Sequence, residues 1–200
     1  MIIENVVQGT PEWQKERVGI PTASCFDKII TVKGERSKQR TKYMYQLAAE
    51  RITGIKENGY QNAVMERGIQ MEDEARKMYE LMTGYTVTTV GVCYPDEQKR
   101  YGCSPDGLIG EEGLVEIKCP TSAIHVGYLL GGVLPTDYVQ QCQGQLLVTG
   151  RKWVDFFSFY PGLKPLLVKV KPDKKFLHSL QVELEIFCKE LDAITEKIRR

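Results

Sequence analysis

Apolar residues recur along the chain with two different periods, which predict where its helices and strands lie. Steps of three and four residues predict helices over 41–53, about 62–82, 136–148 and about 173–198. Short runs of β-branched and aromatic residues predict strands over 85–92, 100–104, 106–109, 114–119, 152–160 and 166–170. The order of these elements along the chain favours an α/β (α+β) fold, with a central mixed β-sheet flanked by helices. That order is helices, a run of strands, a helix, two strands and a last helix.

The clearest helical pattern lies at the end of the chain, where seven apolar residues are spaced by three and four: Leu177, Leu180, Leu184, Phe187, Leu191, Ile194 and Ile198. This stripe predicts an amphipathic helix that packs either on the sheet or on a partner helix. No linker rich in proline and glycine divides the 200 residues, so we expect one domain over 1–200.

Composition narrows the class of protein. Hydrophobic residues make up 42% of the chain and charged residues 26%, which is the balance of a domain with an ordinary core. No apolar run approaches 18 residues, and no basic patch precedes an apolar stretch at the N-terminus, so we expect a cytoplasmic protein with no membrane contact. The six cysteines are scattered and the histidines number two, which argues against a zinc ribbon or a disulfide framework.

The formal net charge is +1, but the charges are unevenly distributed. Six bases and only two acids lie in the segment 27–43. A loop of this charge can contact the phosphates of a nucleic acid, and it can equally be a solvated loop.

One short stretch combines residue types that are typical of metal-dependent hydrolysis. Asp106 begins one predicted strand, and Glu116-Ile-Lys118 lies in the next, across a glycine-bounded acidic turn over 110–113. Alternate side chains of a strand share a face, so Glu116 and Lys118 point to one side while their apolar neighbours point to the core. A hairpin at this point would bring Asp106 close to Glu116.

Two carboxylates at that distance raise each other's pKa unless a cation holds them. Mg²⁺ prefers oxygen ligands and is usually bound by one or two carboxylates together with substrate phosphate. Lys118 beside it would carry positive charge towards a scissile phosphate or orient the attacking water. The same residues also describe a surface hairpin with a single Glu–Lys pair, so the motif by itself leaves both interpretations open.

The wider sequence resembles the PD-(D/E)xK nuclease superfamily, and within it the branch of lambda exonuclease and the YqaJ-type viral recombination nucleases, also called alkaline exonucleases. Six blocks in the same order carry the resemblance over residues 13–149: Trp13-x-x-x-Arg17-x-Gly19-x-x-Thr22-Ala23-Ser24, Gly68-x-Gln70-x-Glu72-x-x-Ala75-Arg76, Cys103-Ser-Pro-Asp-Gly-Leu108, Glu116-x-Lys118-Cys119-Pro120, Leu130-Gly-Gly132, and Gln141-x-Gln143 with Val148-Thr149. The resemblance implies a restriction-endonuclease-like core.

It also implies a set of catalytic residues: Asp106, Glu116, Lys118, Glu72 and Gln143. The catalytic Mg²⁺ would be bound by Asp106, Glu116, Glu72 and the backbone carbonyl of Ile117. Mn²⁺ is expected to substitute for Mg²⁺. Lys118 would activate or position the water. Without the resemblance, the helical glutamate of this set is an ordinary solvated residue and the glutamine an ordinary boundary residue.

The resemblance further implies a pocket for a 5′-terminal phosphate, formed by Arg17 and Ser24 with Ser104 as an additional hydroxyl. A guanidinium forks onto phosphate oxygens, and free N–H groups at a helix start favour an anion. The alternative is that Thr22 or Ser24 only caps a helix over about 23–30.

Together these residues predict a Mg²⁺-dependent deoxyribonuclease that hydrolyses phosphodiester bonds of double-stranded DNA. By resemblance, it is a 5′→3′ exodeoxyribonuclease that digests one strand of a linear duplex. The resemblance implies a 3′ single-stranded overhang for phage-type recombination, a homotrimer, a single-strand-annealing partner protein, and a phage or prophage origin in a bacterial cytoplasm. Three alternatives stay open. They are a structure- or site-specific endonuclease of the same superfamily, an iron–sulfur nuclease, which would need four clustered cysteines, and a non-catalytic DNA-binding module.

Overall fold

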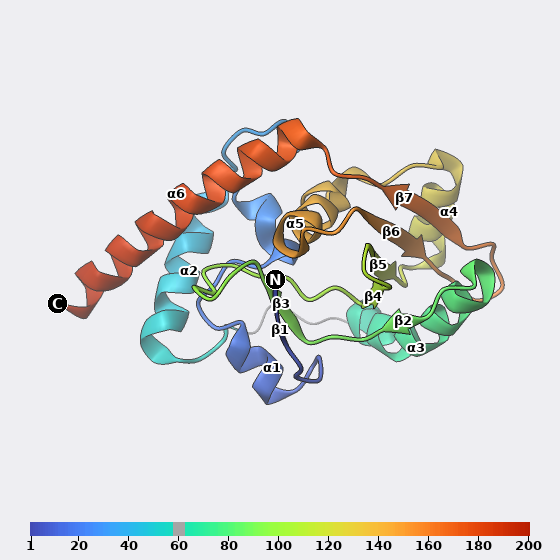
Figure 1. Cartoon of the computed structure of the whole chain (residues 1–200), viewed down its shortest axis with the longest axis horizontal. Coiled ribbons are helices and arrows are strands. Elements are labelled where there is room, and N and C mark those ends of the chain that lie inside the picture. The colour runs from blue at the N-terminus through green and yellow to red at the C-terminus, as the bar shows by residue number, and fades with distance from the viewer. Residues whose placement is uncertain (58–62) are drawn as a thin grey trace.

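Five strands form a mixed β-sheet in the order β2-β4-β5-β6-β7 (Figure 1). The computed structural model describes residues 1–57 and 63–200, and it describes residues 63–69 by their backbone alone. The strands of this sheet are β2 Val87–Thr88, β4 Gly107–Ile109, β5 Gly113–Lys118, β6 Trp153–Ser158 and β7 Leu166–Val170. β5 and β6 run parallel, and the other neighbours run antiparallel. The predicted central mixed sheet is confirmed.

A second, two-stranded sheet joins the N-terminus to the middle of the chain. β1 (Ile2–Glu4) pairs antiparallel with β3 (Val92–Tyr94). The prediction of a single strand over 85–92 is therefore wrong, because the chain changes sheets between β2 and β3. Gly91 lies at this change, where a Cβ would come within 2.3 Å of the Val6 carbonyl oxygen. The predicted strand over 100–104 is also wrong, since only isolated pairings such as Cys93 with Cys103 occur there.

Helices cover both sides of the larger sheet. They are α1 Pro11–Glu16, η1 Ala23–Lys28, α2 Arg40–Thr53, α3 Ala63–Thr83, α4 Ser122–Gly131, η2 Thr136–Tyr138, α5 Val139–Thr149 and α6 Lys174–Arg199, of which η1 and η2 are 3₁₀ helices. The four predicted helices are confirmed as α2, α3, α5 with η2, and α6, although the predicted start of α3 at residue 62 lies outside the described residues. α1 and α4 were not predicted.

Both faces of β5 are buried, so Glu116 lies inside the molecule and the alternative of a surface hairpin is wrong. Val115 and Ile117 pack in a cluster with Ala75 and Tyr79 of α3. Leu114, on the other face, belongs to a larger cluster that includes residues of α5 and α6. In Figure 1, α3 lies on one side of the strands and α5 on the other. The strand that carries Glu116 and Lys118 is therefore packed between two helical layers.

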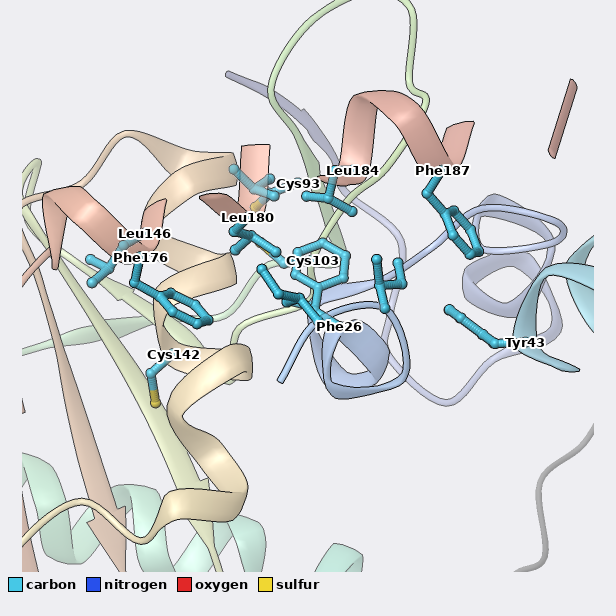
Figure 2. Close-up of a cluster of buried hydrophobic side chains, with 14 of the residues drawn as sticks. Phe26, Tyr43, Cys93, Cys103, Cys142, Leu146, Phe176, Leu180, Leu184 and Phe187 are labelled. Carbon is cyan, nitrogen blue, oxygen red and sulfur yellow. The ribbon is translucent and has the colours of Figure 1, made fainter. Parts of the chain in front are cut away.

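The last helix packs mainly on α2 and α5. Figure 2 shows Leu184 and Phe187 of α6 in the same buried cluster as Phe26 and Tyr43. The rings of Tyr43 and Phe187 are stacked with their centroids 5.8 Å apart. Most of the amphipathic stripe thus packs in the hydrophobic core of this chain, whereas Ile198 is exposed.

Ion pairs fasten part of the basic segment to α6. Arg36 Nε lies 2.9 Å from Glu183 Oε2, and Arg40 is paired with Glu190. Lys33, another base of the segment, is exposed. A DNA contact by the segment stays a prediction. None of the described helices is long and apolar enough to cross a bilayer.

Candidate active site

The β4–β5 hairpin brings two acidic residues to one point of the sheet. Its antiparallel register pairs Gly107 with Val115, so the next step places Asp106 opposite Glu116. The N–H of Ile117 donates to Asp106 Oδ2 at 2.5 Å and holds the carboxylate against β5. Because the N–H and C=O of one strand residue point to the same edge, the Ile117 carbonyl also faces the Asp106 side. The predicted hairpin is confirmed.

Hydrogen-bond donors surround the Glu116 carboxylate, whose residue is only 1% exposed. Lys118 Nζ and Gln141 Nε2 each lie 2.5 Å from Glu116 Oε1. Gln145 Nε2 lies 2.5 Å from Oε2. Both oxygens of this buried carboxylate are therefore paired, as the burial of a charge requires.

A pocket of 390 Å³ opens beside Asp106. Its walls come from the N-terminal segment 5–8, the segment 89–91 and helix α3, which contributes Glu72 and Arg76. Glu72 was predicted from the sequence to lie near Asp106, and the two residues do line the same pocket. The structure therefore brings together the acidic residues that the resemblance selected.

The charges of this site shift the pKa values of its members. Burial raises the pKa of Asp106, and Glu116 and Glu72 raise it further, against the effect of Lys118. Burial also raises the pKa of Glu72. Burial lowers the pKa of Lys118, but Glu116 and Asp106 outweigh this effect and hold the pKa above its ordinary value. Lys118 is therefore a protonated donor at neutral pH, beside carboxylates that a further cation would stabilise.

The structure places Gln143 away from this site, which corrects the sequence interpretation. Its Nε2 donates to the carbonyl of Lys171 at 2.8 Å, and its Oε1 accepts from the N–H of Asp173 at 2.9 Å. Gln143 therefore fixes the chain between β7 and α6. The contacts to Glu116 come from Gln141 and Gln145 instead.

The two glutamines had a signal in the sequence that could have identified them. Residues four apart lie on one face of a helix, so Gln141 and Gln145 point the same way. Gln143 is two residues from each of them, which is about 200° around the helix. Helical phase alone therefore separates Gln143 from the pair.

The residues predicted to bind a 5′-phosphate also lie together. Arg17 Nη2 is 3.4 Å from Thr22 Oγ1 and 3.5 Å from Ser24 Oγ, while the guanidinium lies 3.9 Å over the Trp13 ring. The Trp13 indole N–H donates to Ser104 Oγ at 3.0 Å. Arg17 Nε is buried and makes no hydrogen bond within the described residues. The guanidinium is therefore only weakly paired and can take an anion.

The helix-cap alternative at this position is wrong in detail. Thr22 occupies the N-cap position of η1, but its side chain makes no capping hydrogen bond. Its hydroxyl faces Arg17 instead. η1 is also a short 3₁₀ helix over Ala23–Lys28 rather than a helix that extends to residue 30.

Comparisons with known proteins decide the family. A family model, the YqaJ-like viral recombinase domain, matches residues 12–152. The chain belongs to this family. The alkaline exonuclease LHK-Exo from Laribacter hongkongensis is 35% identical with a TM-score of 0.87, over 96% of this chain and 97% of that chain. LHK-Exo in complex with dAMP matches with the same values.

The solved structure of a second protein supports the fold alone. The phage-related exonuclease from Haemophilus somnus 129PT has a TM-score of 0.69 at 14% identity, over 90% of this chain and 96% of that chain. A comparison with curated proteins gives no match. The predicted family and fold are confirmed, and with them the coarse prediction of a nuclease that acts in DNA recombination.

Changing Gln145 to leucine is expected to lower kcat for DNA hydrolysis about tenfold, because Glu116 Oε2 loses the hydrogen-bond donor that it has among the described residues. Gln143→Leu is the matched control, since it changes the same residue type on the same helix. We expect this control to lower the melting temperature and to leave kcat of the folded enzyme unchanged. Initial rates on linear duplex DNA measure kcat of the two variants, and thermal unfolding measures their melting temperatures. A larger loss of kcat in Gln143→Leu would contradict the assignment.

Proposed function

We propose that this YqaJ-family chain is a Mg²⁺-dependent 5′→3′ exodeoxyribonuclease that digests one strand of linear double-stranded DNA and leaves a 3′ overhang. The observation that carries the proposal is the convergence of Asp106, Glu116 and Lys118 at the end of one hairpin. These residue types at this place are what metal-dependent hydrolysis of a phosphodiester requires.

The donor set fits a divalent cation that prefers oxygen ligands. In the part of the chain whose side chains are described, no three His, Cys, Asp or Glu side chains form a metal site by themselves. Mg²⁺ is commonly bound by one or two carboxylates, with water and substrate phosphate completing its ligands. Asp106, Glu116 and the Ile117 carbonyl would hold the ion, with Glu72 close to it. The raised pKa of Asp106 supports this assignment, because a cation relieves the repulsion between the carboxylates.

The chemistry divides between the ion and the chain's own residues. Bound Mg²⁺ supplies Lewis-acid stabilisation of charge on the phosphate oxygens. Lys118 is protonated and donates to Glu116, so it is suited to orient the attacking water and to stabilise negative charge. Gln141 and Gln145 keep the Glu116 carboxylate in one orientation. The site is thus preorganised before DNA binds.

End recognition is assigned to Arg17, Ser24 and Ser104. The weakly paired guanidinium of Arg17 supports this assignment, because a phosphate would supply the bonds that its protein neighbours do not. LHK-Exo has been solved in complex with dAMP. A 5′-mononucleotide is the product that a 5′→3′ exonuclease releases, and we propose the same product here.

The remaining parts of the proposal rest on family resemblance. They are a homotrimer, a single-strand-annealing partner, and action in the cytoplasm of a bacterial host. A near-neutral net charge is compatible with DNA binding, since only the surface that faces DNA needs local positive charge.

The test is digestion of a linear duplex labelled at one end, with the 5′ terminus either phosphorylated or hydroxylated. We expect loss of 5′-terminal nucleotides, a protected 3′ strand, and no cleavage of a closed circle. Cleavage of the circle would identify an endonuclease. Absence of cleavage with retained DNA binding would identify a non-catalytic module.

Arg17→Ala is expected to remove the preference for 5′-phosphorylated ends, because it removes the guanidinium that lies beside Ser24 in the proposed pocket. A hydrogen-bonded phosphate–arginine pair contributes about 2 kcal/mol, so the ratio of kcat/KM for the two ends should fall about thirtyfold. Initial rates on the phosphorylated and hydroxylated duplexes measure this ratio. An unchanged ratio would refute the pocket.

A further inference from the structure

We propose that Glu50, Arg51 and Lys56, at and just beyond the end of α2, position Arg17 for the 5′-terminal phosphate. We name these three residues the Gly19 clamp, because they hold the turn around Gly19. The inference rests on the proposed function, since it concerns the same end-binding pocket.

The clamp holds the backbone next to Arg17 from three directions. The N–H of Gly19 donates to Glu50 Oε2 at 2.9 Å. Arg51 Nε donates to the carbonyl of Gly19 at 2.7 Å, and Lys56 Nζ donates to the carbonyl of Arg17 at 3.1 Å. Figure 1 shows α1 and the end of α2 on the same side of the molecule, where the clamp joins them. Both backbone groups of Gly19 are therefore fixed to α2, and the carbonyl of Arg17 is fixed to the segment that follows α2.

Glu50 is the rigid centre of the clamp. The residue is 2% exposed, and its Oε2 also accepts from Lys56 Nζ at 2.9 Å. Its Oε1 accepts from Gln46 Nε2 at 3.1 Å and from the N–H of Glu57 at 3.2 Å. A buried carboxylate is tolerated only when its oxygens are paired, and here each oxygen has two donors. Such a fully paired network leaves the carboxylate one orientation.

Gly19 lets the turn approach α2 closely. Its φ of +68° is in the left-handed region, and a Cβ at this position would lie 2.3 Å from Arg51 Cγ. The turn follows α1 directly, whose C-cap is Arg17. Arg17 is thus placed by a contact between the ends of two helices rather than by a free loop.

The side chain of Arg17 needs this support. Its hydrogen bonds to Thr22 and Ser24 are long, at 3.4 and 3.5 Å, so they orient the guanidinium only weakly. The backbone anchor and the Trp13 ring therefore decide where the guanidinium lies. A misplacement of about 1 Å can cost a factor of up to about 100.

The test compares Lys56→Met with the wild type on duplexes that carry a 5′-phosphate or a 5′-hydroxyl. Lys56 is partly exposed, so we expect the variant to fold. The ratio of kcat/KM for phosphorylated over hydroxylated ends should fall about tenfold, through a higher KM on phosphorylated ends. Kinetics on hydroxylated ends should stay within about twofold of wild type, which general destabilisation would not allow.

Three further variants sharpen the test. Lys56→Arg keeps a cationic donor and should retain most of the ratio. Lys152→Met removes an exposed lysine paired with Glu112 on the β4–β5 turn, and should leave the ratio unchanged. In an Arg17→Ala background, Lys56→Met should have no additional effect on the ratio, because a positioning residue acts only through the residue it positions.

The outcomes separate this inference from the proposed function. If Arg17→Ala loses the end preference and Lys56→Met keeps it in full, the clamp is overturned and the pocket stands. An additional effect of Lys56→Met in the Arg17→Ala background would also overturn the clamp. If the wild type itself shows no end preference, the proposed pocket fails and the clamp fails with it.

Discussion

Lys118→Met is expected to lower the rate of DNA cleavage by about 10²- to 10³-fold while DNA binding persists. Lys118 Nζ lies 2.5 Å from Glu116 Oε1, and its raised pKa keeps it charged beside the carboxylates. Methionine has a similar length but offers neither charge nor hydrogen bond. The substitution therefore removes the charge that would stabilise the transition state and orient the water, and it leaves Gln141 as the remaining donor to Oε1.

Single-turnover rates on linear duplex and fluorescence anisotropy of labelled DNA measure the two properties separately. Lys152→Met is the matched control, because Lys152 pairs with Glu112 at the opposite end of β5. We expect the control to cleave at the wild-type rate. A Lys118→Met enzyme that cleaves normally would remove Lys118 from the mechanism and leave the carboxylates as the whole of the site.

The β4–β5 hairpin was predictable because local rules decide it. A glycine-bounded turn and strand alternation place Asp106 opposite Glu116 without any knowledge of the rest of the chain. Tertiary packing was not predictable in the same way. Glu116 faces α5 in a buried layer, since β5 pairs with β6 in parallel and such strands are covered on both faces.

Helix α4 could not be predicted from periodicity. Ile124 and Leu130 are apolar yet exposed, so the helix lacks the polar face that marks an amphipathic segment. The break between β2 and β3 was missed for a different reason. β-branched residues continue from Thr86 to Val92 with only Gly91 between them, and the pairing of β3 with the distant β1 is what separates β3 from β2.

The structure brings Asp106, Glu116 and Lys118 together, as the sequence led us to expect, and places the side chain of Gln143 elsewhere. Asp106, Glu116 and Lys118 follow from strand spacing, which has a short range. Gln143 was chosen by resemblance, whereas its place in α5 turns it towards the carbonyl of Lys171. Resemblance therefore identified the block, and helical phase decides which residue of the block faces the carboxylate.

Removal of divalent metal is expected to stop cleavage completely, and Mg²⁺ or Mn²⁺ should restore it. A second readout does not depend on activity. At a concentration of about 100 times its dissociation constant, Mg²⁺ should stabilise the fold by about 2.7 kcal/mol. For a chain of this length this raises the melting temperature by about 5 °C or more. Thermal unfolding in EDTA and in Mg²⁺ measures the shift.

Asp106→Asn is the variant that tests whether this stabilisation comes from the carboxylates. Burial and Glu116 raise the pKa of Asp106, so its charged form is disfavoured in the folded state. Between its unfolded and folded pKa, stability falls as pH rises, because the folded state binds more protons there. At neutral pH the neutral asparagine should therefore make the protein in EDTA more stable than wild type and abolish its stabilisation by Mg²⁺. A variant that Mg²⁺ still stabilises fully would show that the ion does not bind at Asp106. A variant that is less stable than wild type in EDTA would show that the charged Asp106 carboxylate does not destabilise the fold.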